Sequence, residues 1–225
     1  MNEEEVELRA EGEESIPLSV LTPPDRARAA VLLGHGLGVD RTHPTVRIPA
    51  EQLVELGLAV VVPDLPRHGV RRNGAAARED AVAVWQTYWT SGGPAALRDE
   101  WLRIAAFARQ RFPTGRLGYF GLSLGTQYGI VFLANAPQIA AAVLGLFGAE
   151  PPPKSPILNA WAPRVRCPVY FVQKQSDELH PLERSDYLYA TLGSAEKVLD
   201  SSPGRHADVT PETCARACKF LAERL

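Results

Sequence analysis

Short apolar runs alternate with longer stretches of helical periodicity along most of this 225-residue chain. The apolar runs are bounded by Gly, Pro or polar residues, as buried strands are, and cover 29–33, 59–62, 117–120, 140–146 and 169–172. The helical stretches lie at 48–56, 95–111, 124–135, 182–191 and 211–224. This alternation predicts an α/β fold with a mainly parallel central sheet that helices cover on both faces.

Two β-compatible segments, 6–10 and 16–21, precede this series and are separated by the turn sequence EGEE. We expect them to form a hairpin of two short edge strands. The chain is long enough for one large α/β domain and too short for two domains with a linker. Residues 1–225 are therefore expected to form a single domain.

The composition narrows the range of partners. Charged residues make up 22% of the chain and the net charge is −2, which indicates neither nucleic-acid nor membrane binding. The acidic amino-terminal segment does not resemble a signal peptide, and the longest apolar run, 139–149, is about half the length of a membrane span. We therefore expect a cytoplasmic protein.

Cysteine and histidine do not form a metal-binding pattern. Cys214 and Cys218 lie four apart on a predicted helix, with no histidine or further cysteine at ligand spacing. Packing of small side chains on one helix face is the simpler interpretation of this pair. The histidines show no HExxH-type spacing, so we expect neither a metal nor another cofactor.

The sequence GLSLG at 121–125 lies where an apolar strand gives way to a helical stretch. A nucleophile elbow needs this context, because it holds a serine on a sharp strand-to-helix turn with the hydroxyl above the sheet. Gly121 and Gly125 fit the motif, since larger side chains would collide in such a turn. The pattern makes Ser123 the candidate nucleophile, and a helix N-cap serine is the alternative.

A second glycine-rich turn, GHGLG at 34–38, follows the first apolar run. Acyl transfer places negative charge on the substrate oxygen, which two backbone N–H groups can stabilise. We assign these donors to Leu37 and to Leu124, the residue after the candidate nucleophile. His35 lies beside this turn and is expected to be structural.

A carboxylate and then a histidine are expected after the serine, each in a loop beyond a strand. Asp177 follows the last apolar run, and His206 follows a further short strand at 197–199. Neutral imidazole can accept a proton near pH 7, and a buried carboxylate can orient it. Asp177 and His206 therefore complete a candidate catalytic triad. Glu178 and Asp208 are the weaker candidates for the acid.

In these motifs the chain resembles the α/β-hydrolase superfamily from Ala29 to Leu225. GHGLG is similar to the family's oxyanion turn, DLPRHG at 64–69 to its frequent DLPGHG segment, and GLSLG to its elbow. Small size makes the chain look most like the dienelactone-hydrolase-like and small carboxylesterase branch, without a separate cap domain. The dienelactone enzymes carry a cysteine at the elbow, so Ser123 is a departure. Arg67 is another, because it replaces a family glycine.

The resemblance implies a serine hydrolase that cleaves carboxylic esters of small to medium acyl or aryl groups through an acyl-enzyme on Ser123, without a cofactor. Its partner would be a small-molecule ester. Thioester hydrolysis, acyl transfer and small-peptide cleavage use the same residues and stay open as alternatives. A ligand-binding protein that has lost catalysis is a further alternative, which the complete set of candidate residues disfavours.

The segment 70–94, which follows DLPRHG, is longer than the core fold requires. It carries Trp85, Tyr88 and Trp89 at helical spacing, followed by the sequence SGGP. One interpretation is a lid whose rings form an apolar wall over Ser123 and bind substrate. The alternative is a short surface helix that packs the same rings on the core.

Overall fold

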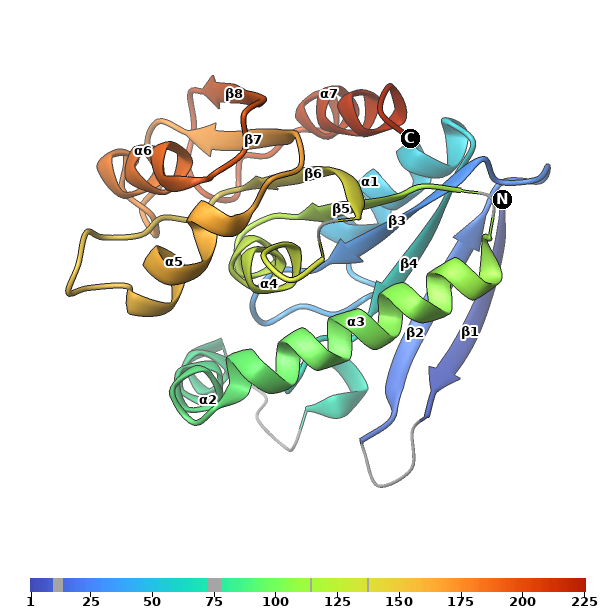
Figure 1. Cartoon of the computed structure of the whole chain (residues 1–225), viewed down its shortest axis with the longest axis horizontal. Coiled ribbons are helices and arrows are strands. Elements are labelled where there is room, and N and C mark those ends of the chain that lie inside the picture. The colour runs from blue at the N-terminus through green and yellow to red at the C-terminus, as the bar shows by residue number, and fades with distance from the viewer. Residues whose placement is uncertain (10–13, 73–77, 114, 137) are drawn as a thin grey trace.

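A central β-sheet organises the molecule (Figure 1). The computed structural model describes residues 1–225 except 10–13, 73–77, 114 and 137. In this part of the chain eight strands form one sheet in the order β1-β2-β4-β3-β5-β6-β7-β8. Their bounds are β1 Asn2–Leu8, β2 Ile16–Thr22, β3 Ala29–Gly34, β4 Leu58–Pro63, β5 Leu117–Gly121, β6 Ile139–Gly145, β7 Val169–Lys174 and β8 Lys197–Ser202. The strands from β4 across to β8 run parallel, which confirms the predicted mainly parallel sheet.

β1 and β2 form the predicted antiparallel hairpin, and β2 also pairs with β4 in antiparallel orientation. The prediction of two edge strands is correct for β1 and wrong for β2, which lies between β1 and β4. β1 exposes most of its acidic side chains, whereas residues 16–21 are buried. Because IPLSVL is apolar or small at both alternating sets of positions, β2 can be covered on both faces. Residues 11–13 of the EGEE turn lie outside the described residues.

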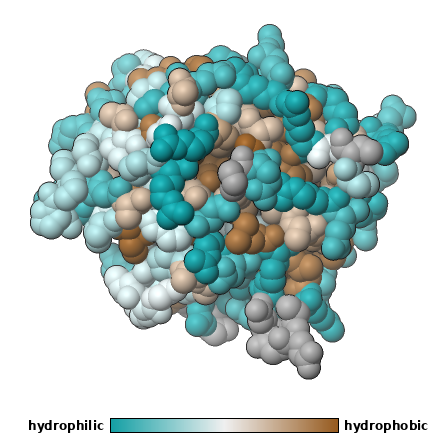
Figure 2. Space-filling model, in the orientation of Figure 1, coloured by the Kyte–Doolittle hydropathy of each residue, from teal (hydrophilic) through white to brown (hydrophobic). Residues whose placement is uncertain are grey.

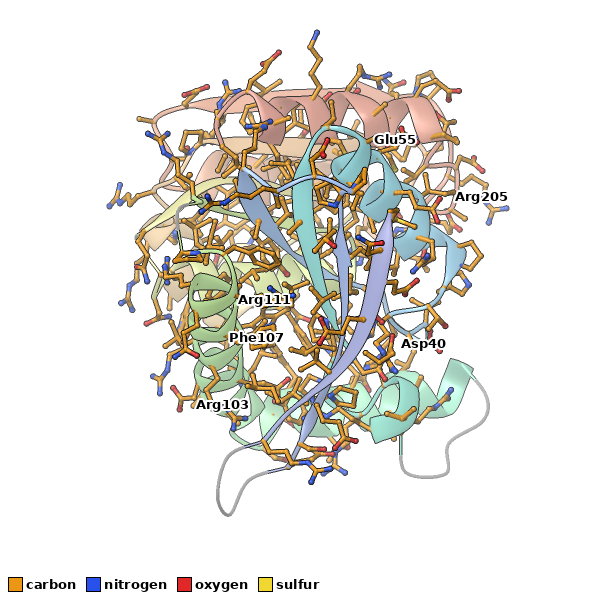
Figure 3. All side chains as sticks on the ribbon, turned by 90° about the vertical axis from the view of Figure 1, so that its right-hand side faces the viewer. Asp40, Glu55, Arg103, Phe107, Arg111 and Arg205 are labelled. Atoms are coloured by element: carbon orange, nitrogen blue, oxygen red, sulfur yellow. The ribbon has the colours of Figure 1, made fainter. Side chains whose placement is uncertain are left out.

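Helices cover both faces of the sheet. Their bounds are α1 Pro44–Glu55, α2 Arg78–Thr90, α3 Gly93–Arg111, α4 Leu124–Leu133, α5 Pro156–Trp161, α6 Leu182–Thr191 and α7 Pro211–Ala222, with short 3-10 helices at Gly69–Arg71 and Ala162–Arg164. α1 and α7 lie on one face, and α3 and α4 on the other (Figure 1). Figure 3 shows this from the side of β1, with Phe107 of α3 on one side of the sheet and Glu55 of α1 on the other. The fold class is the predicted one, and the described residues form no separate cap domain.

Each face of the sheet packs into its own apolar core. On the α3 and α4 side, the rings of Trp101, Tyr119 and Phe132 lie 5.3 to 5.8 Å apart between centroids. On the other side, Leu53 and Phe120 belong to the core under α1 and α7. The face of the molecule shown in Figure 2 is largely hydrophilic, with apolar residues between the polar ones. Among the described residues, no helix has both the length and the apolarity to span a membrane.

α2 and α5 have no counterpart among the separately predicted strands and helices. α2 covers residues 78–90 of the 70–94 segment and carries the three aromatic residues that the sequence places at helical spacing. Residues 73–77 of that segment lie outside the described residues. The other predicted elements agree with the structure to within a few residues at their ends, except that β1 and α1 each begin four residues before the predicted start, at Asn2 and Pro44.

Candidate active site

Ser123 occupies a strained turn between β5 and α4. Its backbone has φ 56° and ψ −121°, a conformation that residues other than glycine rarely adopt. The Ser123 N–H donates to the carbonyl of Gly145 over 2.9 Å, which ties the turn to the neighbouring strand. A Cβ on Gly121 would lie 2.6 Å from the Gly125 carbonyl oxygen, and one on Gly125 would lie 2.5 Å from that of Gly34. The turn therefore requires both flanking glycines, as the motif predicts.

Ser123, His206 and Asp177 form a continuous chain of hydrogen bonds. Nε2 of His206 lies 3.0 Å from the Ser123 Oγ, and its Nδ1 lies 2.8 Å from Oδ2 of Asp177. Because a carboxylate can only accept, Nδ1 carries the proton and Nε2 is left to accept from the serine hydroxyl. The three residues come from the loops after β5, β8 and β7, which end at one edge of the parallel sheet.

The carboxylate of Asp177 is held by more than the histidine. Its side chain is buried, and Oδ1 accepts the backbone N–H groups of Leu179 and His180, both over 2.9 Å. The two competing acids have other partners. Glu178 accepts the backbone N–H of His206 over 3.0 Å, and Asp208 accepts that of Arg205 over 2.7 Å. Of these three carboxylates, Asp177 is the one bonded to the imidazole ring.

The GHGLG turn follows β3 and is fixed by its own histidine. His35 is 1% exposed, and its Nε2 accepts the backbone N–H of Leu65 over 3.0 Å. Nδ1 therefore carries the proton and donates to the Gly36 carbonyl over 2.8 Å. Burial, with a smaller effect of His68, lowers the pKa of His35 to about 3. His35 is thus a neutral bridge between this turn and the loop after β4, and it does not contact Ser123.

The two predicted oxyanion donors come from two separate segments of the chain. Leu37 belongs to the GHGLG turn and lines the same cavity as Ser123. Leu124 follows the serine, is buried and begins α4. An amide at the first position of a helix has no partner within that helix, so it is available to a substrate oxygen. The roles of Leu37 and Leu124 stay predictions on this placement.

The aromatic residues of α2 pack against α4. The Trp85 indole N–H donates to Oε1 of Gln127 over 3.1 Å, and the Trp89 ring stacks on Tyr128 with 6.0 Å between centroids. Tyr88 lies 6.5 Å from the same Tyr128 ring. These contacts are those expected if α2 packs its rings on the core. The assignment of Trp85, Tyr88 and Trp89 to substrate binding stays a prediction.

The cavity that contains Ser123 opens on the α1 and α7 side and measures about 330 Å³. It is lined by Ser123 and His206, by residues 34–37 of the GHGLG turn, and by apolar residues that sequence reasoning did not single out: Val46, Ile48, Phe120, Leu146, Val209 and Cys214. Their segments are far apart along the chain. An apolar residue at the end of a predicted strand next to a candidate catalytic loop could have pointed to Phe120 and Leu146, whereas the residues from α1 and α7 carry no such local signal.

A second histidine lies beside His206. The ring of His180 is 5.7 Å from that of His206 and 4.3 Å from that of Phe147, measured between centroids. Burial, assisted by the neighbouring His206, lowers the pKa of His180 to about 4, so its ring is neutral near pH 7. Among the described residues, no group of three His, Cys, Asp or Glu side chains could hold a metal ion.

Comparison with known proteins identifies the family. The sequence profile of the dienelactone hydrolase family matches residues 18–201. This chain belongs to the dienelactone hydrolase family. Among solved structures, a cold-adapted esterase from an Arctic intertidal metagenomic library has a TM-score of 0.86 at 29% identity, over 99% of this chain and 94% of the esterase. A search of curated proteins gives no significant match.

More distant members of the same fold also align over nearly the whole chain. The dienelactone hydrolase from Anabaena variabilis has a TM-score of 0.74 at 20% identity and is covered to 96%, with 99% of this chain. An esterase from Pyrococcus furiosus has a TM-score of 0.72 at 16% identity and is covered to 93%, again with 99% of this chain. The family and the Arctic esterase together make this protein an ester hydrolase with an α/β-hydrolase fold.

Proposed function

We propose that this protein is a serine hydrolase that cleaves carboxylic esters of small to medium acyl or aryl groups through an acyl-enzyme on Ser123. The observation that carries the proposal is the bonded series from the Ser123 Oγ through both nitrogens of His206 to Asp177, at 3.0 and 2.8 Å. A structural N-cap serine would use its hydroxyl to accept a helix N–H, and the Ser123 side chain makes no such bond.

Each residue has one task in the proposed reaction. His206 Nε2 accepts the hydroxyl proton while the Ser123 Oγ attacks the ester carbonyl, and Asp177 stabilises the imidazolium that forms. The backbone N–H groups of Leu37 and Leu124 stabilise the negative oxygen of the tetrahedral intermediate. His206 then protonates the leaving alcohol. Water then attacks the acyl-enzyme with His206 as the base. The acyl group leaves as the carboxylic acid, and His206 returns a proton to the Ser123 Oγ.

Active-site labelling and turnover test this function together. We expect a fluorophosphonate probe to add one mass equivalent to the wild-type protein and none to Ser123→Ala. p-Nitrophenyl acetate should be hydrolysed by the wild type, with kcat lowered by about 10⁴-fold or more in Ser123→Ala. A protein that neither reacts with the probe nor hydrolyses the ester would be a non-catalytic binding protein.

A further inference from the structure

The cavity beside Ser123 has mostly apolar walls. They come from the ends of β3, β5 and β6, from the start of α1 and from the start of α7. Val46, Phe120 and Leu146 are buried apolar residues of its lining, while Ile48 is 37% exposed and so lies at the rim. None of the described residues that line the cavity is Asp, Glu, Lys or Arg.

Two polar residues of these walls, Cys214 and His35, are neutral near pH 7. Burial raises the pKa of the Cys214 thiol to about 11, so it stays protonated near pH 7. His35 is kept neutral by its burial. His43 lies at the start of α1, where its Nδ1 accepts the backbone N–H of Thr45. A charged substrate group placed here would lose water without gaining a partner of opposite charge.

Charged side chains gather in a different hollow. This second cavity, of about 310 Å³, is lined by Asp40, Arg41 and Asp64 among others, and it does not include Ser123 or His206. Arg41 and Asp64 bind each other there, with 2.5 Å between Nη1 and Oδ2. Arg41 and Asp64 are therefore paired with each other, and these charged residues do not line the reaction cavity.

We propose that the cavity bounded by Ile48 and Cys214 binds an uncharged apolar group of the ester and excludes a carboxylate-bearing one. The inference rests on the proposed function and adds its substrate class. Ile48 at the rim and Cys214, 7% exposed in the wall, limit the size of that group. A cavity of this volume is at the lower end of small-molecule sites, which matches a short chain or a single ring.

Matched pairs of esters test the exclusion of charge. In the acyl arm, p-nitrophenyl hexanoate is compared with mono-p-nitrophenyl adipate, and in the alcohol arm, hexyl acetate with 6-acetoxyhexanoate. We expect kcat/KM to be at least about 50-fold higher for the neutral ester in one arm, because a buried carboxylate would be unpaired. The arm that discriminates identifies which part of the ester enters the cavity. Discrimination of less than threefold in both arms overturns the proposal.

Variants of the wall test the location. The readout is the kcat/KM for the neutral six-carbon ester of the discriminating arm, divided by the kcat/KM for p-nitrophenyl acetate. Cys214→Phe should lower this ratio by about tenfold or more. Ile48→Trp changes the exposed rim without touching the core and should lower the same ratio. Cys218→Ala, on the same helix outside the cavity, should leave the ratio unchanged. An unaltered ratio in both wall variants overturns the proposal. If the wild-type protein does not react with the fluorophosphonate probe, the serine mechanism itself is disproved.

Discussion

Asp177 shows how a single residue can be chosen among near neighbours. The strand position after β7 made it the preferred acid, and the structure bonds its Oδ2 to the His206 ring, whereas Glu178 and Asp208 accept backbone N–H groups. Sequence position alone does not separate Asp177 from Glu178. The two acids are adjacent, and a shift of the loop by one residue would direct the other side chain toward the histidine. The decisive feature is the short side chain, which can bind two backbone amides and the imidazole at once.

Asp177→Asn should lower kcat by about 10⁴-fold, because an amide in place of the carboxylate favours the wrong tautomer of the His206 ring. Glu178→Gln and Asp208→Asn should each stay within about tenfold of the wild type, because neither side chain contacts the ring. Steady-state hydrolysis of p-nitrophenyl acetate measures all three. A mild loss in Asp177→Asn with a severe one in either control would reassign the acid.

His35 links two loops that carry the site. Removal of its ring in His35→Ala leaves the N–H of Leu65 and the carbonyl of Gly36 without their present partner. Because the GHGLG turn would lose this brace, we expect kcat to fall about 10- to 100-fold with a smaller change in KM. A rate of fluorophosphonate labelling equal to that of the wild type would show that the turn keeps its geometry without His35.

At the scale of elements, the elbow depends on the close approach of β3, β5 and α4. A Cβ on Gly125 meets the Gly34 carbonyl oxygen at 2.5 Å, whereas one on Gly36 has only Val39 Cγ2 within range, at 3.9 Å. Gly125→Ala should therefore destabilise the protein by about 1–3 kcal/mol, or roughly 2–12 °C in Tm. Gly36→Ala, a matched change in the adjoining turn, should alter Tm by less than about 2 °C. Equal melting temperatures would show that the elbow can relax.

Trp89 tests whether α2 covers the site or the core. Its ring stacks on Tyr128, which is fully buried, so Trp89→Ala removes packing that stabilises α2 against α4. We expect a loss of about 1–3 kcal/mol, less than the cost for a fully buried tryptophan, with the relative kcat/KM values across acyl chain lengths unchanged. Thermal melting and an acyl-chain series give the two readouts. A shifted chain-length preference at constant Tm would support the lid.

Local patterns predict where the elements lie along the chain better than they predict which elements lie side by side in the fold. The apolar runs and helical stretches find the parallel strands and the longer helices, because periodicity is a property of contiguous residues. α5 has six residues and is too short to show a helical period. The interior place of β2 depends on its pairing with β4, which lies beyond β3 and α1 along the chain. The cavity beside Ser123 could not be predicted for the same reason. Its lining comes in part from α1 and α7, which lie far apart along the chain.

The whole molecule stores several histidines in neutral form. Burial lowers the pKa of His35 to about 3 and that of His180 to about 4, and it also lowers the pKa of His68. In the unfolded chain these groups titrate near pH 6.5. Between the folded and unfolded pKa values the unfolded state binds more protons, so the free energy of unfolding falls as the pH falls. Each such histidine contributes a slope of about 1.4 kcal/mol per pH unit in that window.

Stability should therefore decline on acidification from pH 6.5 toward pH 5, before most carboxylates of the unfolded chain take up protons. His180→Gln isolates one contribution, because His180 lies at the edge of the site and its glutamine replacement does not titrate. Urea unfolding at pH 7, 6 and 5.5 gives the free energy of unfolding as a function of pH. Between pH 6 and 5.5, the slope of this free energy against pH should be smaller in the variant than in the wild type, by the amount that corresponds to about one bound proton. Parallel slopes would mean that the His180 ring binds a proton in the folded protein, and a wild-type stability that is flat over this range would exclude neutral burial of His35 as well.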